Sequence, residues 1–380
     1  AQVQLSSPRV NMALFLGKGD KQGAIPFFAT DKRPGIPQAL DAWIKKTEGL
    51  TIQVENGQLN LQSKENQSFQ FSDIDISIDN ANGNLAIELS CASNLFNRMD
   101  LKGQLDLASL KTHGTLSLKD LKIDLLDKTK RPELMPLENG ALDLQLDFDA
   151  VGTKDFKATV EASAPSLGLS RGQRKIMVKG VRIKGSVHFG EGVLEASISD
   201  MTLDYPRLGL IGAFKMEEDT PLVSLHLEGK AVDVAAARSC ALAFAGDIPA
   251  VKNIFAVIID GNVPFISVDA GGNVTDLGIL DRYTIRGEMR KGRIALSNLG
   301  LNLTDVDGGA LISKGILSGQ RLRANLGNIE GKEGILTVAL EQGAAPFRLD
   351  IQVDADLAEA YPILKRLVTE GAFAEHLRHI

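Results

Sequence analysis

Apolar and polar residues alternate along most of this chain, most regularly from Leu50 to Leu125. Apolar side chains take every second position there, and Gln, Asn, Asp, Ser and Lys stand between them. A period of two predicts strands that have one apolar face and one polar face. Turn-forming groups such as Asn56-Gly57 and Asn82-Gly83 separate the runs, as antiparallel hairpins require. The pattern therefore predicts an antiparallel sheet that is apolar on one side.

Alternation of the same kind resumes after a loop at residues 127–138 and continues, with one interruption, to residue 356. No Ser-rich or Pro-rich linker divides these runs, so we expect one continuous body. The predicted fold class is mainly β: a long curled antiparallel sheet that forms a taco-like hydrophobic groove, with a few short capping helices. The predicted divisions are an N-terminal strand and edge-capping helix (1–48), the first part of the groove (49–232), a helical insert (233–262), the second part of the groove (263–356) and a C-terminal capping helix (357–380).

Three stretches depart from the strand pattern and predict helices. Residues 37–47 and 357–368 are amphipathic, and we expect them to cover the two edges of the sheet, where unpaired backbone groups invite aggregation. Between residues 233 and 262 the period changes, which predicts two short helices joined by a corner before Pro249. Asp247 and Lys252 argue against a transmembrane hairpin there. A packed helical pair over or beside the sheet is the expectation, and a lid that touches a membrane is the alternative.

Composition narrows what the apolar face can hold. Hydrophobic residues make up 44% of the 380 positions but aromatic residues only 5%, with one Trp and three Tyr. The lining is therefore mostly Leu, Ile and Val, which suits alkyl chains better than sugars or nucleobases, because those usually need stacking rings. The formal net charge is −6 and the basic residues are scattered, which argues against nucleic-acid binding.

Catalytic and metal-binding patterns are lacking in the sequence. It has no nucleophile elbow, phosphate-binding loop or dinucleotide fingerprint. His376 and His379 have a spacing that metal ligands also use, but a charged helix tip explains them better because no third ligand cluster accompanies them. Cys91 and Cys240 are expected to be buried small hydrophobes rather than a disulfide. We predict that the protein is not an enzyme and needs no metal or cofactor.

A short unit of an apolar residue, a basic residue and glycine recurs three times. It places Gly103, Gly185 and Gly287 at positions that share the parity of the apolar residues. These glycines therefore belong to the apolar face. Two compatible interpretations follow: the glycines make bulges or bends in the sheet, or the missing side chains leave room for a guest.

Several strings point to a known family. Residues 50–61 (LTIQVENGQLNL) and 99–107 (MDLKGQLDL), and the closing strings at 315–324, 346–351 and 354–357, resemble the AsmA-like family of Gram-negative envelope proteins, which includes the YhdP and TamB types. The closing strings are similar to the AsmA-like C-terminal region. The likeness covers most of residues 50–368. The chain departs from the family in being short and in lacking the expected N-terminal membrane anchor, and we expect it to be an excised or processed piece.

The resemblance implies a role in moving phospholipid between the inner and outer membranes. It also implies a periplasmic location, anchored to the inner membrane in the full-length protein by a segment that this chain lacks. The expected ligand is a phospholipid or another acyl lipid, and protein partners stay undefined. The alternative is a structural or adhesin-like β scaffold with a filled core. The expected lipid-binding residues that line the groove are Ile76, Ile87, Gly103, Leu105, Leu118, Leu144, Val160, Ile183, Gly185, Leu203, Leu225 and Gly287.

Overall fold

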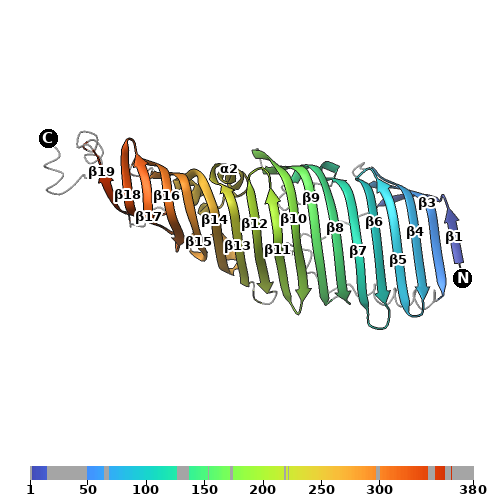
Figure 1. The fold of residues 1–380 in the computed structure, drawn as a ribbon. Helices are drawn as coiled ribbons and strands as arrows, with labels where there is room; N and C mark the ends of the chain where they lie inside the picture. Colours follow the sequence, from blue (N-terminus) through green and yellow to red (C-terminus); the bar gives the residue numbers. More distant parts are fainter. Residues whose placement is uncertain are drawn as a thin grey trace. The chain divides into compact units, whose positions relative to one another are not determined.

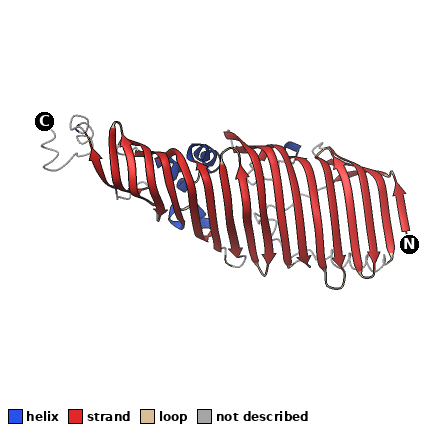
Figure 2. Cartoon of the chain, in the orientation of Figure 1, coloured by secondary structure: helices blue, strands red, loops and turns tan. Residues whose placement is uncertain are grey.

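In a computed structural model, the described part of the chain consists mostly of strands (Figures 1 and 2). It describes residues 2–14, 49–63, 68–125, 137–152, 154–171, 174–217, 220, 222–296, 300–340, 347–355 and 361. The strands of this part of the chain form one sheet of 19 strands, most of them antiparallel. The predicted fold class, a mainly β protein with a long antiparallel sheet and few helices, is confirmed.

The chain divides into two compact units, and strands β8, β9 and β10 contribute residues to both. Unit 1 comprises Ala1–Asp127, Ala141–Ser163 and Val187–Glu191. Strands β3 to β8 pair in chain order, each antiparallel to the next, whereas β1 and β2 both run parallel to β3. Its elements are β1 (Gln2–Ser6), β2 (Arg9–Leu14), β3 (Leu50–Ser63), β4 (Ser68–Ala81), β5 (Asn84–Ser93), β6 (Phe96–Asp106), β7 (Lys111–Lys122), the 3-10 turn η1 (Ile123–Leu125), and most of β8 (Leu137–Val151) and part of β9 (Asp155–Arg171).

Unit 2 comprises Lys128–Gly140, Ala164–Ser186 and Gly192–Ile380. From β11 to β19 each strand again pairs antiparallel with its successor. Its elements include most of β10 (Arg174–Gly190), then β11 (Val193–Leu203), β12 (Leu208–Glu217), β13 (Leu222–Asp233), α2 (Val234–Ala245), α3 (Pro249–Val257), β14 (Ile258–Asn273), η2 (Val274–Gly278), η3 (Leu280–Arg282), β15 (Tyr283–Leu296), β16 (Leu301–Ser313), β17 (Ile316–Leu326), β18 (Ile329–Ala339) and β19 (Phe347–Asp354).

The two Asn-Gly pairs named in the sequence have different roles. Asn82 and Gly83 have φ values of 53° and 75° and join β4 to β5, with Ala81 opposite Asn84, so this hairpin is confirmed. The prediction of a hairpin corner at Asn56-Gly57 is wrong. Both residues lie inside β3, where the register shifts and Asn56 has a φ of 51°. A two-residue hairpin and a bulge both need positive φ, which Asn and Gly supply at low cost, so the dipeptide alone does not distinguish them.

At three bulges of the sheet, an aspartate carboxylate accepts a hydrogen bond from the backbone of the bulged strand. The backbone N–H of Asn56 donates to Asp75 Oδ1, that of Asp120 to Asp143 Oδ1 and that of Lys291 to Asp307 Oδ1, each at 2.9 Å. In each case the donor has positive φ and the acceptor lies on the neighbouring strand. The aspartate thus satisfies an N–H that the interrupted ladder leaves without a strand partner.

The helical pair predicted after β13 is confirmed, with α2 and α3 as its members. Asp233 caps α2 by accepting a hydrogen bond from Ala236 N at 3.0 Å, and Pro249 occupies the first turn of α3, where its missing N–H costs nothing. The predicted helix at 37–47 lies outside the described residues, as do His376 and His379, and only residue 361 of the predicted helix at 357–368 is described.

Candidate functional site: the apolar face of the sheet

The apolar side chains of unit 1 lie in continuous rows that cross its strands. Residues opposite each other in antiparallel strands share a face, so the register alone defines each row. One row runs through seven strands without a polar residue: Leu5, Val54, Ile76, Leu89, Leu101, Leu116 and Leu146. A second row contains Ile52, Ile78, Ile87, Gly103, Gly114 and Phe148.

Most of the residues in these rows are neither buried nor fully exposed. In the first row the members from Val54 to Leu146 are half-buried, and Leu5 is 49% exposed. Leu105 and Leu118, which flank the two rows on the same face, are also half-buried, whereas Leu85 and Cys91 are buried. Burial raises the pKa of the Cys91 thiol above its usual value, with the nearby Asp100 carboxylate adding to the effect. Unit 1 therefore presents aliphatic surface that its own described residues cover only in part.

The glycines of the recurrent unit differ in what surrounds them. A methyl group added at Gly103 would meet nothing closer than the His113 carbonyl oxygen, 3.8 Å away. At Gly185 it would collide with the Ser197 carbonyl, and at Gly287 it would lie 3.3 Å from Val263 Cγ1. Gly103 thus leaves free space on the face, whereas Gly185 permits a close approach of backbone.

Unit 2 has comparable rows, and their burial changes along the sheet. One row holds Ile198, Gly212, Leu227, Val268, Ile285, Ile312, Leu317, Val338 and Phe347. Ile198 and Leu227, on β11 and β13, are half-buried. Ile312 and Leu317, on β16 and β17, are only 3% and 2% exposed. The first strands of the row resemble unit 1, β16 and β17 belong to a filled core, and Phe347 on β19 is exposed again.

The largest cluster of buried residues described for unit 2 lies around Leu336. Leu336 is 0% exposed, and it packs with Leu301, Val306 and other residues contributed by β15 to β18. A second cluster joins Ile312 and Leu317 to residues of α3 and η3. This part of the apolar face packs against protein.

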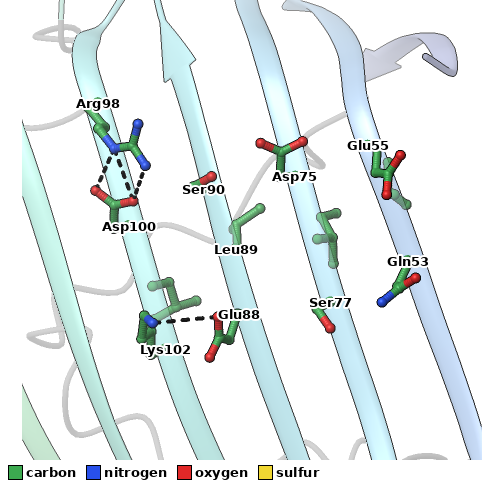
Figure 3. A pocket seen from close by; sticks show the side chains of 13 residues that line it. Gln53, Glu55, Asp75, Ser77, Glu88, Leu89, Ser90, Arg98, Asp100 and Lys102 are labelled. Carbon is green, nitrogen blue, oxygen red and sulfur yellow. Dashed lines mark hydrogen bonds and ion pairs between the residues drawn. The ribbon is translucent and has the colours of Figure 1, made fainter. Parts of the chain in front are cut away.

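The polar face of unit 1 contains a hollow of about 370 Å³, shown in Figure 3. Four of its six charged side chains form two ion pairs: Arg98 donates to Asp100 at 2.8 Å, and Lys102 Nζ lies 3.5 Å from Glu88 Oε2 (Figure 3). The other two are Glu55 and Asp75. The hydrogen bond from Arg98 lowers the pKa of Asp100. The lining also includes Val54, Ile76, Leu89 and Leu101, which belong to the first aliphatic row.

The three histidines among the described residues also lie on the polar side, each beside an aspartate. His113 Nδ1 is 2.9 Å from Asp149, His188 Nε2 is 3.3 Å from Asp155, and His226 Nδ1 is 2.6 Å from Asp269. The hydrogen bond with Asp269 raises the pKa of His226. In the described part of the chain no group of three or more His, Cys, Asp or Glu residues is arranged to hold a metal ion.

Every residue that the sequence assigns to lipid binding is half-buried in the structure. The register brings together Ile76, Ile87, Gly103, Leu105, Leu118 and Leu144 on one face of unit 1, and Val160 belongs to the same unit on β9. Ile183, Gly185, Leu203, Leu225 and Gly287 belong to unit 2. The predicted residues are therefore distributed over both units.

Sequence reasoning missed one aromatic feature of the apolar face. The Phe148 ring lies over Gly114, because a methyl group added at Gly114 would be 2.5 Å from Phe148 Cζ. Phe148 stacks on Phe156, with ring centroids 6.4 Å apart. The contact arises because Gly114 lies opposite Phe148 across β7 and β8. The alternation of apolar and polar residues does not predict which residues of two strands lie opposite each other.

Comparisons with known proteins add no identification: no family model, curated protein or solved structure matches this chain. Within the described residues, no helix is long and apolar enough to span a bilayer.

Proposed function

We propose that this chain binds acyl lipids on the apolar face of its sheet. The observation that carries the proposal is the row from Val54 to Leu146, in which six consecutive strands each present a half-buried aliphatic side chain. Contact between this surface and hydrocarbon is favourable, by about 0.8 kcal/mol for each CH₂ group that is moved out of water. On a face that is already partly buried, each CH₂ group contributes only part of that amount.

The row also favours movement of the ligand along it. Its members are Val, Ile and Leu, so a hydrocarbon chain meets nearly the same surface from one strand to the next. A binding energy that changes little with position presents low barriers to sliding. Together with the resemblance to the AsmA-like family, this supports intermembrane phospholipid transport in a Gram-negative envelope as the role, with a periplasmic location and an inner-membrane anchor in the full-length protein. No step of this role calls for a catalytic residue or a cofactor.

A second candidate function is a structural β scaffold with a filled core. The cluster around Leu336 favours it for strands β15 to β18, where little apolar surface is left for a guest. The half-buried rows of unit 1 favour lipid binding over this alternative. A filled core would give no saturable binding of hydrocarbon.

Titration of the purified chain with a fluorescent fatty acid tests lipid binding. Leu101→Gln places a polar amide in the aliphatic row, and Lys102→Gln is the matched control one residue along β6 on the polar face. We expect saturable binding by the wild-type chain and a loss of affinity of about tenfold in Leu101→Gln, equivalent to about 1.4 kcal/mol. Lys102→Gln should bind like the wild type. Absence of saturable binding, or an equal loss in both variants that retain wild-type circular dichroism, contradicts the proposal.

A further inference from the structure

Two helices and a 3-10 turn cover part of the apolar face within unit 2. Ala250 of α3 and Leu280 of η3 are 6% and 1% exposed, and they pack in one cluster with Ile312, Leu317 and Leu340. Ile254 and Val257 of α3 border the same cluster. The side chains beneath α3 therefore have protein contacts where a guest would otherwise lie.

The helices are fixed to the sheet and to each other. Val234 and Ala236 at the start of α2 are buried, and Val234 packs with Val232 and Val263 of the strands. Arg238 Nε of α2 donates to the Phe255 carbonyl of α3 at 3.0 Å. The Asp233 cap and the packing of Val234 thus fix the start of α2, and the Arg238 hydrogen bond joins α2 to α3.

Side-chain exposure falls along a single row where α3 and η3 lie over it. In the row that contains Ile198 and Leu227, these two residues are half-buried, whereas Ile312 and Leu317 farther along, which pack with residues of α3 and η3, are 3% and 2% exposed. All belong to unit 2, and all share one face of the sheet. The row continues, but the space above it is occupied.

We infer that α2, α3 and η3 end the acyl-binding part of the apolar face in unit 2, a conclusion that rests on the proposed lipid binding. Hydrocarbon binds on the half-buried rows of β3 to β8 and of β11 to β13, and it is excluded from β16 to β18. Interiors of proteins are close-packed, so a chain entering above Ile312 and Leu317 would have to displace the side chains of α3. The binding surface then ends where the helical pair packs on the sheet.

Photolabelling locates the bound chain. The wild-type chain is incubated with palmitic acid that carries a diazirine in the middle of the chain, irradiated, digested and analysed by mass spectrometry. We expect label on peptides that contain Ile76, Leu89 or Leu101, and no label on peptides from β16 to β18. Label on Ile312, Leu317 or Leu336 in the wild type overturns the inference. Label on no peptide contradicts lipid binding itself, so the two failures are distinguishable.

A variant pair on α3 tests whether the helix causes the exclusion. Ile254→Ala removes side-chain volume above the cluster, and Lys252→Ala truncates an exposed residue of the same helix. We expect Ile254→Ala to gain label on the peptide that contains Ile312 and Leu317, and Lys252→Ala to label like the wild type. Circular dichroism and thermal unfolding establish that both variants are folded. If folded Ile254→Ala gains no label there, the exclusion does not come from α3 and the inference is wrong.

Discussion

Gly103 and Gly114 face each other across β6 and β7, yet an added methyl group would meet different surroundings at the two positions. At Gly103 the nearest atom is 3.8 Å away, whereas at Gly114 the Phe148 ring is 2.5 Å away and the Lys102 carbonyl oxygen 2.8 Å. The sequence pattern places Gly103 on the apolar face, and the register puts Gly114 opposite it. What fills the space beside a glycine depends on the side chain opposite, and the alternation does not give that register.

The pair therefore makes a matched test of the apolar face in unit 1. We expect Gly114→Ala to lower the free energy of unfolding by about 1–3 kcal/mol, because the methyl group forces the Phe148 ring to move. Gly103→Ala should change it by less than about 0.5 kcal/mol, since the methyl group points into open space. Urea unfolding of the two variants measures both values. Equal destabilisation by the two substitutions would contradict the free space at Gly103.

Strand bulges are the recurrent feature at the scale of the element. Asp143 on β8 accepts the N–H of Asp120 on β7 and, at 3.1 Å, a hydrogen bond from Lys119 Nζ. The backbone hydrogen bond is the largest cause of the lowered pKa of Asp143. Because the carboxylate is the form that accepts these bonds, ionisation of Asp143 stabilises the bulge.

This bulge is expected to weaken in acid. A lowered pKa in the folded state means that the stabilisation is complete above the unfolded pKa of about 3.9 and is lost as the pH falls through the lower, folded value. Hydrogen exchange of peptides from β7 and β8 should therefore speed up, relative to the intrinsic rate, below about pH 4. Asp143→Asn keeps an oxygen acceptor without the charge, so its relative exchange should change less over that range. An identical pH response in the wild-type chain and in the Asp143→Asn variant would contradict this role of Asp143.

Alternation predicted the strands well, because a half-buried strand requires a period of two whatever its neighbours are. It also predicted α2 and α3, where the period changes. It did not separate bulges from turns at Asn56-Gly57, since both use the same backbone conformation. Nor did it distinguish Leu101 from Leu336, which occupy similar apolar positions but differ in whether another part of the chain packs on them.

At the scale of the whole chain, two kinds of apolar surface coexist in one fold. Unit 1 has aliphatic rows that its described residues leave half-buried, and unit 2 has a core around Leu336 that excludes solvent. Because the aromatic content is low, most positions in the rows are aliphatic, and Phe148 is an exception. The polar face carries ion pairs such as those of Arg98 and Lys102, which balance charge and keep that side in water.

Mass spectrometry of organic extracts from the purified chain tests the central claim most directly. If the half-buried rows hold hydrocarbon, the extract contains acyl lipid in amounts comparable to the protein, and delipidated protein takes up lipid again from phospholipid vesicles. An extract without lipid, together with no uptake from the vesicles, would contradict lipid binding and leave the structural scaffold as the function of the sheet.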